Sequence, residues 1–573
     1  MRLRALALLL MMVAGIARVT AAAPPECADV RAPNWRPATG VADDAGDFRV
    51  FAIQFKQDLR HIETYEAFER KFDCMVQEFV LPSLDLDGDG DTDKPTIVVF
   101  NEDDGLAQLG TGTRGVGARA ISAGPVKDPD SIAAAQAAFV TLGATYSPAI
   151  GYYAAAEPET SPQRLILAAA TDTFARGFTR TFSDMARRYG IYVVSSNNQA
   201  EFRATSVSEH PEALALVDPD LAEQYLSGEL DIVYEAVDDD TISEEQGAGR
   251  AGIDVHNQAF MWAPVDGVTD YAAARYEQLN GAPLTADDPR ANLIHVVKKT
   301  PLTNIEREVL DLSDDSDLSE ANTGPFCLLL ADDATCAAKF GYGISLPTFM
   351  WGETPCAECP EGVRDLEFGE APSTADDPCT LGPKWWMRCL DHRGVNVLLQ
   401  PEANPGPWGG FTTGRESRGS GLWQPLTWLD SAWRAVADPS VGFRYAVTPH
   451  MVGNLVDLVF DGQSVIFERC SPLDGGDTCD GNEPQAFIGT GAFVPCAGAG
   501  DLGCETPAWA PYSGLKREIM ALAPWVLEED PTLDARTNRS RFEQRANAML
   551  AGSGSVFEND YLETAIWADL DVG

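Results

Sequence analysis

The feature that most constrains the fold of this chain is a repeated alternation of short apolar runs with segments of helical periodicity. Runs such as TIVVF at 96–100 and VNVLLQ at 395–400 are apolar on both faces, as strands covered on both sides must be. The stretches at 63–84 and 179–190 instead place apolar residues three or four positions apart. Strands that alternate with helices in this way predict a layered α/β fold.

The expected core segments are separated by insertions of different composition. Segments that contain a strand lie at 48–59, 94–103, 179–198, 255–264, 292–299, 340–345, 383–404 and 443–468. The insertions are acidic or rich in glycine and proline, and lie at 201–250, 307–325, 353–382 and 471–510. We expect these insertions to be surface loops, because such composition favours turns over regular structure. The 573 residues are enough for one large domain with additions.

The N-terminus has the pattern of a secretory signal peptide. Two arginines precede an apolar run that ends at Ala17, and three alanines at 21–23 provide a cleavage site. We therefore predict a signal peptide over 1–23 and a polar leader over 24–47, which makes the protein secreted or periplasmic. Because no other apolar stretch approaches membrane-spanning length, we expect no insertion into a membrane.

The cysteines and the charge fit an exported protein. All 12 cysteines follow the predicted cleavage site, and an even number in an oxidising compartment favours disulfide bonds. Cys356 and Cys359 form a CAEC pair that resembles redox and metal motifs, but a structural disulfide is favoured because no second pair accompanies it. The formal charge of −45 at pH 7 repels phosphate backbones, so we expect no nucleic-acid partner.

A run of alternating aspartates, DLDGDGDTD at 85–93, is a candidate calcium site. Hard cations bind several oxygen ligands at short range, and a glycine-containing loop can fold them around one ion. The candidate ligands are Asp85, Asp87, Asp89, Asp91 and Asp93. The spacing begins like an EF-hand loop, but its twelfth position is Thr96 rather than Glu, and a solvated turn is an equally good interpretation. Any calcium here would be structural rather than catalytic.

Three polar residues close three of the expected strands. Glu102 follows TIVVFN, Lys299 ends NLIHVVKK and Ser345 ends FGYGIS. In layered α/β folds chemistry gathers at the carboxyl ends of strands, so a carboxylate, an ammonium group and a hydroxyl could converge there. Neither a Gly-x-Ser-x-Gly nor a His-Glu-x-x-His motif offers another hydrolytic site.

A series of segments in this order resembles the nitrilase, or carbon–nitrogen hydrolase, superfamily. The matching segments are VFAIQF at 50–55, VVFNED at 98–103, FSDMARRYGIYVVSSN at 182–197, VHNQAFMWAPVDG at 255–267, KKTPLTNIE at 298–306, HRGVNVLLQPEAN at 392–404 and the strands within 443–467. The resemblance implies a four-layer α-β-β-α sandwich of the nitrilase type with disulfide-rich loop insertions. This domain is expected over 48–535, followed by a helical tail over 536–573.

The resemblance also implies roles for the strand-end residues. Glu102 would be the general base, Lys299 the cation that stabilises an oxyanion, and Glu306 a second carboxylate that positions the substrate. The nucleophile position falls on Ser345, where the family has cysteine, and Leu-Pro follows it where the family commonly has an aromatic and an acidic residue. The implied substrate is a small non-peptide amide or nitrile, with no cofactor for catalysis. Members of the superfamily often form oligomers, so the resemblance is compatible with a homo-oligomer.

Replacement of the thiol by a hydroxyl leaves several functions open. A thiol of pKa about 8.5 becomes a thiolate readily beside a cation and a base, whereas a serine hydroxyl needs a stronger base such as histidine or neutral lysine. The chain is therefore either an amidase-type hydrolase that uses Ser345 or a displaced Cys356 or Cys359, or a catalytically silent binding or scaffold protein. Outside the resemblance, it could be a calcium-stabilised extracellular interaction protein.

Overall fold

The computed structural model covers the whole chain, and its description extends to most of the residues between 27 and 572. The described residues are 27–86, 92, 94–123, 133–237, 252–265, 284–300, 302–303, 305–313, 318–328, 338–345, 350–351, 377–403, 408, 424–438, 440–455, 458–470, 518–527, 561–572 and scattered positions from 530 to 548. The predicted signal peptide therefore lies outside them. Within these ranges no helix combines the length and the apolar character needed to cross a membrane.

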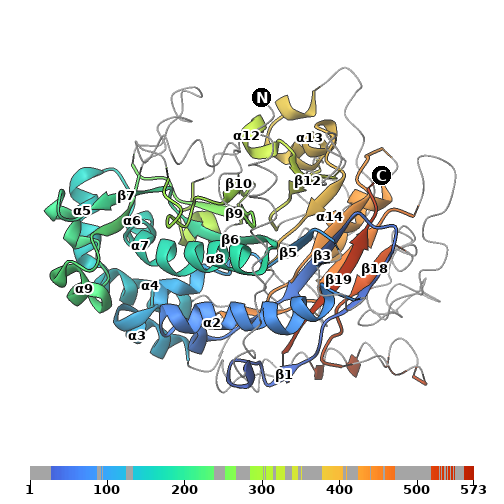
Figure 1. Ribbon diagram of the computed structural model, residues 1–573, viewed down its shortest axis with the longest axis horizontal. Helices are drawn as coiled ribbons and strands as arrows, with labels where there is room; N and C mark the ends of the chain where they lie inside the picture. Colours follow the sequence, from blue (N-terminus) through green and yellow to red (C-terminus); the bar gives the residue numbers. More distant parts are fainter. Residues whose placement is uncertain are drawn as a thin grey trace, which may run out of the picture.

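Two β-sheets form the centre of the molecule (Figure 1). In the described part of the chain, the larger has eight strands in the order β1-β19-β3-β5-β6-β9-β10, with β2 paired to β19. Its strands are β1 (Asn34–Trp35), β2 (Thr39–Val41), β3 (Phe48–Gln54), β5 (Thr96–Val99), β6 (Tyr192–Gln199), β9 (His256–Trp262), β10 (Leu293–Lys298) and β19 (Leu562–Leu570). The neighbours β3, β5 and β6 are parallel, whereas β9 is antiparallel to both β6 and β10.

The second sheet has six strands among the described residues, in the order β11-β12-β13-β14-β17-β18. They are β11 (Phe326–Leu328), β12 (Ala338–Tyr342), β13 (Val397–Leu399), β14 (Tyr445–Thr448), β17 (Val465–Glu468) and β18 (Ile519–Leu522). Strands β12, β13 and β14 are parallel. A third sheet joins β16 (Leu458–Asp461), β15 (Val452–Leu455) and β4 (Lys56–Gln57).

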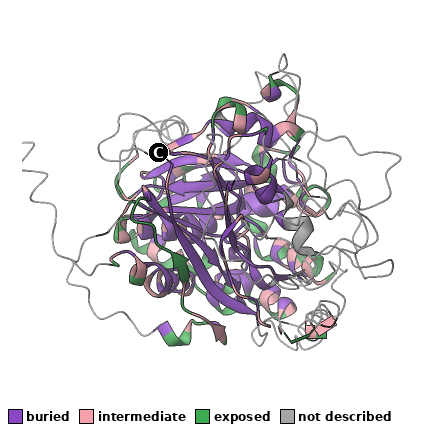
Figure 2. Cartoon of the chain, turned by 90° about the vertical axis from the view of Figure 1, so that its right-hand side faces the viewer, coloured by how far each residue is buried: buried purple, intermediate pink, exposed green. Residues whose placement is uncertain are grey.

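The two large sheets share an apolar core. Phe48 and Val50 of β3 belong to the same buried cluster as Phe340 of β12 and Val447 of β14. The rings of Phe48 and Phe340 meet edge to face with their centroids 5.3 Å apart. Figure 2 shows that the strands are buried along most of their length, whereas exposed positions lie on helices and at the periphery. Because the strands are covered on both sides, their sequences are apolar on both faces.

Helices α2 (Tyr65–Met75) and α8 (Arg180–Tyr189) cover the other face of the larger sheet. Phe72 of α2 and Phe182 of α8 pack with ring centroids 4.9 Å apart, in one cluster with residues of β5 and β9. The side-chain oxygen of Thr64 accepts the Ala67 N–H at the start of α2. On the smaller sheet, α13 (Trp386–His392) and α14 (Gln424–Ala437) contribute to the shared core. The predicted α/β fold is confirmed as a mixed arrangement of helices with parallel and antiparallel sheets.

A helical region not anticipated from the sequence follows β5. It contains α3 (Gly112–Ser122), α4 (Ala133–Thr145), α5 (Ser147–Ala156), α6 (Pro162–Ala169) and α7 (Thr171–Phe174), with its own buried cluster. The insertion at 201–250, predicted as a surface loop, joins this region through β7 (Phe202–Ser206), α9 (Ala222–Ser227) and β8 (Ile232–Ala236). The loop prediction was wrong there because apolar positions such as Val233, which is fully buried, are scattered among acidic residues.

The end of the chain also differs from the prediction of a helical tail over 536–573. Residues 562–570 form β19, which is buried throughout and runs antiparallel to β3 inside the larger sheet. Its charged residues suggested solvent exposure, but both are paired: Glu563 with Lys71 at 2.5 Å and Asp569 with Arg49 at 2.6 Å. These partners lie hundreds of positions earlier in the chain, so no local pattern could reveal them.

The expectation of disulfide bonds is confirmed for every cysteine that the structure describes. Cys27 is bonded to Cys74, and Cys379 to Cys389. Cys327 and Cys470 are disulfide-bonded as well. Cys356 and Cys359, the candidates for a displaced nucleophile, lie outside the described residues. Among the described cysteines there is accordingly no free thiol that could replace Ser345.

Candidate functional site

The order of strands in the larger sheet brings Glu102 and Lys299 together. Glu102 follows β5 and Lys299 follows β10, and these strands run in the same direction because β9 is antiparallel to β6 and to β10. Their carboxyl ends therefore lie at the same edge of the sheet. The Lys299 Nζ donates to Glu102 Oε1 at 2.5 Å, and both side chains are almost completely buried.

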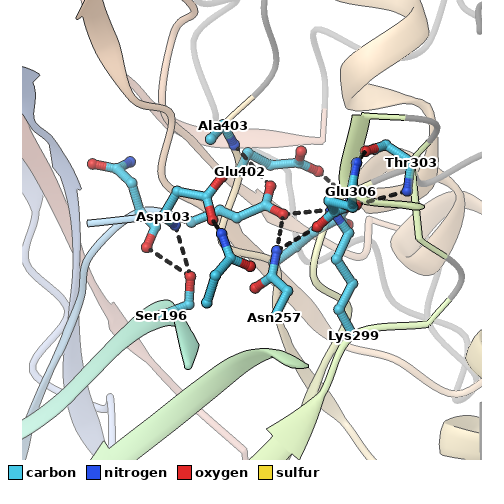
Figure 3. Close-up of polar contacts among 12 residues, drawn as sticks. Asp103, Ser196, Asn257, Lys299, Thr303, Glu306, Glu402 and Ala403 are labelled. Carbon is cyan, nitrogen blue, oxygen red and sulfur yellow. Dashed lines mark hydrogen bonds and ion pairs between the residues drawn. The ribbon is translucent and has the colours of Figure 1, made fainter. Parts of the chain in front are cut away.

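Glu306 forms the second ion pair of Lys299. Lys299 Nζ lies 3.0 Å from the Glu306 carboxylate, as Figure 3 shows. Glu306 lies on a short π-helical segment, η9 (Ile305–Val309), whose entry is fixed by Thr303. The Thr303 N–H donates to Glu306 Oε2 at 2.6 Å, and the Glu306 N–H donates to Thr303 Oγ1 at 3.1 Å. This reciprocal pair resembles a helix capping box and holds the carboxylate toward the lysine.

Asn257 joins the two carboxylates and was not singled out from the sequence. It lies at the start of β9, which begins at the edge where β5 and β10 end. Its Nδ2 donates to Glu102 Oε1 at 2.8 Å and to Glu306 Oε1 at 2.7 Å. Figure 3 shows Asn257 pointing toward Glu306. Asn257 lies in a polar triplet, 256–258, at the start of a strand that is otherwise apolar, and asparagine has many structural uses. Its role depends on the pairing of β6, β9 and β10.

The two buried carboxylates that share Lys299 have pKa values shifted in opposite directions, although the lysine lowers both. Burial and the charge of Glu306 raise the pKa of Glu102, although Lys299 and Asn257 act against this. Burial also opposes ionisation of Glu306, but Lys299 and the hydrogen bonds from Asn257 and Thr303 outweigh it and lower the pKa. Burial disfavours the charged form of Lys299, yet the neighbouring carboxylates raise its pKa. Lys299 is therefore cationic at neutral pH, and Glu102 is the carboxylate better suited to carry a proton.

Two further acidic residues follow Glu102 and are also buried. Asp103 has a positive φ of 63°, its N–H donates to Ser196 Oγ at 2.9 Å, and its carboxyl accepts from Asn198. Burial, with Glu102 as the next cause, raises the pKa of Asp103 well above its usual value. Burial likewise raises the pKa of Asp104, whose carboxyl accepts the Ser195 hydroxyl at 2.8 Å. Both shifts disfavour ionisation of Asp103 and Asp104.

Ser345 lies at the end of β12, next to the segment that follows β13. Its φ is 48°, a left-handed conformation that is uncommon for serine, and the residue is 2% exposed. The Ser345 N–H donates to the Pro401 carbonyl at 3.2 Å, and two residues later the Ala403 N–H donates to Glu102 Oε2 at 3.1 Å. The stretch 401–403 thus contacts both Ser345 and Glu102. Across these two residues the Cα atoms are at most about 7.6 Å apart.

The predicted calcium loop is described only at its edges. Asp85 is described, whereas Asp87, Asp89, Asp91 and Asp93 lie outside the described residues. In the ranges that are described, no group of three or more His, Cys, Asp or Glu side chains is arranged to hold a metal ion.

Comparisons with known proteins give structural neighbours but no close relative. No family model matches the chain, and no curated protein matches it. A carbon-nitrogen hydrolase from Helicobacter pylori G27 is similar in structure, with 10% identity, coverage of 74% of this chain and 84% of that chain, and a TM-score of 0.33. An amidase from Nesterenkonia sp. shows 12% identity, coverage of 75% and 85%, and a TM-score of 0.27. Similarity of this degree indicates neither an activity nor a substrate for this chain.

Proposed function

We propose that this chain is an exported carbon–nitrogen hydrolase-like protein that acts on a small non-peptide amide or nitrile. The observation that carries the proposal is the buried ion-paired cluster in which Lys299 bridges Glu102 and Glu306. Buried charges are costly to keep, and perturbed carboxylates around a fixed cation are typical of catalytic sites. We further propose that the sheets and helices make up the four-layer α-β-β-α sandwich of the nitrilase type.

The proposed roles follow from the charge states of the cluster. Glu102, with its raised pKa, accepts the proton of the Ser345 hydroxyl while the oxygen attacks the amide carbon. The carbonyl π electrons move onto oxygen, and the Lys299 ammonium stabilises the resulting oxyanion. As the intermediate collapses, the C–N bond breaks and Glu102 returns the proton to the departing nitrogen. Water then hydrolyses the acyl ester. Glu306 keeps Lys299 charged and in position throughout.

Backbone conformation supports Ser345 as the residue presented to the substrate. Non-glycine residues with positive φ store strain of about 1–3 kcal/mol and cluster at functional sites. Ser345 is one of three such residues among those described, and Asp103, beside Glu102, is another. One strained residue lies beside Glu102 and the other is the proposed nucleophile, and this supports a functional site here.

A catalytically silent binding protein is the second candidate, and the charge of Lys299 favours it. A hydroxyl nucleophile normally recruits histidine or a neutral lysine as its base. Because Glu102 and Glu306 raise the pKa of Lys299, this lysine cannot take that part. Glu102 is then the base that remains, and a carboxylate is a weak base for a serine. The two candidates share the same binding site and differ in the rate of acyl transfer.

Glu102→Gln is expected to abolish turnover of acetamide or acetonitrile while it preserves folding. The amide is isosteric and can still accept a hydrogen bond from Lys299, but it cannot take up the serine proton. Ammonia release would be measured for wild type and variant, and thermal unfolding would show that both are folded. Glu69→Gln, at an exposed carboxylate paired with Arg188, is the matched control. Equal ammonia release from wild type and Glu102→Gln would contradict the proposal, and amide binding without release would identify the silent protein.

We also propose that residues 1–23 direct export and that residues 85–93 bind structural calcium. The disulfides of the described cysteines support an oxidising compartment.

Calcium at the aspartate run is expected to raise the melting temperature, because a ligand that binds only the folded state stabilises it. At a calcium concentration 100 times the dissociation constant, the gain is about 2.7 kcal/mol. Differential scanning calorimetry in chelator and in millimolar calcium checks this, with magnesium as the control. Identical melting temperatures would rule out the site.

A further inference from the structure

An apolar cavity is lined by residues of the helical region and by residues that lie close to Glu102 and Glu306 in the chain. Its volume is about 130 Å³ and it is partly open to the surface. Two helices that contribute to its wall, α3 and α4, lie against each other (Figure 1). The side chains that matter here come from the helices and from two short segments near the carboxylates: Leu106, Leu109, Ala138, Leu142, Ile305 and Val309. Pockets of this kind bind the apolar part of small molecules.

Two walls of the cavity belong to the segments that carry the site's carboxylates. Ile305 immediately precedes Glu306 and lies with it on η9. Leu106 begins η5 (Leu106–Gly110), a 3-10 turn that follows Glu102, and its N–H donates to the Asp103 carbonyl at 3.1 Å. The cavity wall therefore includes a residue next to Glu306 and a residue of the turn that follows Glu102, which brings the cavity close in the chain to both carboxylates of the cluster.

The polar side chains around the cavity are already engaged by the protein. The Arg119 guanidinium donates to the Gly110 and Gly112 carbonyls, the latter at 2.9 Å. The Ser122 hydroxyl donates to the Ala118 carbonyl at 2.9 Å. An anionic or strongly hydrated ligand would lose its hydration in the cavity without gaining hydrogen bonds from the protein, so binding of such a ligand is disfavoured. The lining instead suits a hydrocarbon group.

We infer that this cavity holds an apolar substituent of the substrate with about five or six carbon atoms. The size follows from an engineered apolar protein cavity of about 150 Å³, which binds benzene. The inference rests on the proposed function and narrows it: the preferred substrate is an amide or nitrile with a medium-length alkyl or aromatic group. The polar head of this molecule lies at Lys299, and its apolar group lies between α3, α4 and η9.

Affinity for primary amides is expected to rise with chain length up to hexanamide. Each methylene that moves from water into an apolar site improves binding about fourfold. Hexanamide has four more methylenes than acetamide, so we expect it to bind roughly 200-fold more tightly. Isothermal titration calorimetry on full-length Glu102→Gln protein measures this without turnover, and decanamide should bring little further gain. Equal affinities for acetamide and hexanamide would overturn the inference.

Substitutions on α4 test whether this cavity causes the dependence of affinity on amide chain length. Ala138→Phe fills the cavity and is expected to remove the hexanamide advantage, whereas Leu142→Ala enlarges it and should move the optimum toward octanamide. Val140→Phe is the control, because Val140 is on the same helix but 73% exposed and does not line the cavity. An unchanged chain-length profile in both cavity variants would also overturn the inference. Acetamide hydrolysis without any chain-length preference would leave the proposed function standing, and chain-length preference without hydrolysis would leave only the binding site.

Discussion

Ser345→Cys is expected to raise the rate of amide hydrolysis by about 100-fold or more. General-base assistance typically contributes 10²–10⁴-fold, and the serine lacks a base strong enough to deprotonate it. The proposed site brings position 345 near the charged Lys299, and there a cysteine would form a thiolate more easily, because a nearby cation lowers a thiol pKa. Ammonia release from hexanamide or acetamide at pH 7 to 8 measures the gain. In the proposed mechanism, Lys299 and Glu102 would serve the new nucleophile in the same roles as they serve Ser345.

The control for this gain is Ser227→Cys, which adds a thiol at an exposed position on α9. It reports any reaction of a free thiol that is unrelated to the site, and any exchange with the native disulfides. Robust hydrolysis by the wild type with no increase in a folded Ser345→Cys protein would contradict the view of Ser345 as a weak nucleophile. A gain that also appears in Ser227→Cys would contradict the placement of the site.

Lys299→Met is expected to destabilise the folded state by about 3–5 kcal/mol at neutral pH. Removal of one partner from a buried ion pair leaves an uncompensated charge, and this typically costs that amount. Here two carboxylates, Glu102 and Glu306, lose the same cation. Urea unfolding followed by circular dichroism measures the loss. Because Lys299 is 4% exposed, little water can replace its charge.

The loss of stability in Lys299→Met is expected to change with pH in a defined direction. Without the lysine, the folded-state pKa of Glu102 rises further, and that of Glu306, which is lowered in the wild type, rises as well, because burial is no longer opposed by the Lys299 charge. A carboxyl with a raised folded-state pKa contributes stability below its unfolded pKa and loses it as pH increases. The deficit of Lys299→Met relative to wild type should therefore shrink as pH falls toward 5. The double variant Lys299→Met with Glu102→Gln should recover part of the loss at pH 7. A deficit that does not change with pH would contradict the assigned charges.

The carboxyl ends of two strands were predictable because their positions depend on local pattern. Glu102 and Lys299 each follow a clear apolar run, and the layered fold predicted that such ends meet. Asn257 was not identified, because its use depends on which strands pair with β9. Within the predicted tail, residues 562–570 were assigned wrongly, because Glu563 and Asp569 are charged residues in a buried strand. Their partners, Lys71 and Arg49, are distant in the sequence.

The sequence alone determined the α/β alternation, the oxidised cysteines among the described residues and the residue types at the ends of the strands. Each depends on composition or short-range periodicity, which a single chain displays directly. The tertiary structure alone decided the antiparallel pairing of β19 with β3 and the charge state of Lys299. Strand pairing is a non-local contact, and a buried group's pKa depends on distances and desolvation that exist only after folding. Because Lys299 is charged, the proposed site has no neutral lysine to act as a base for Ser345, and the proposed roles leave Glu102 to carry the proton and Lys299 to stabilise the oxyanion.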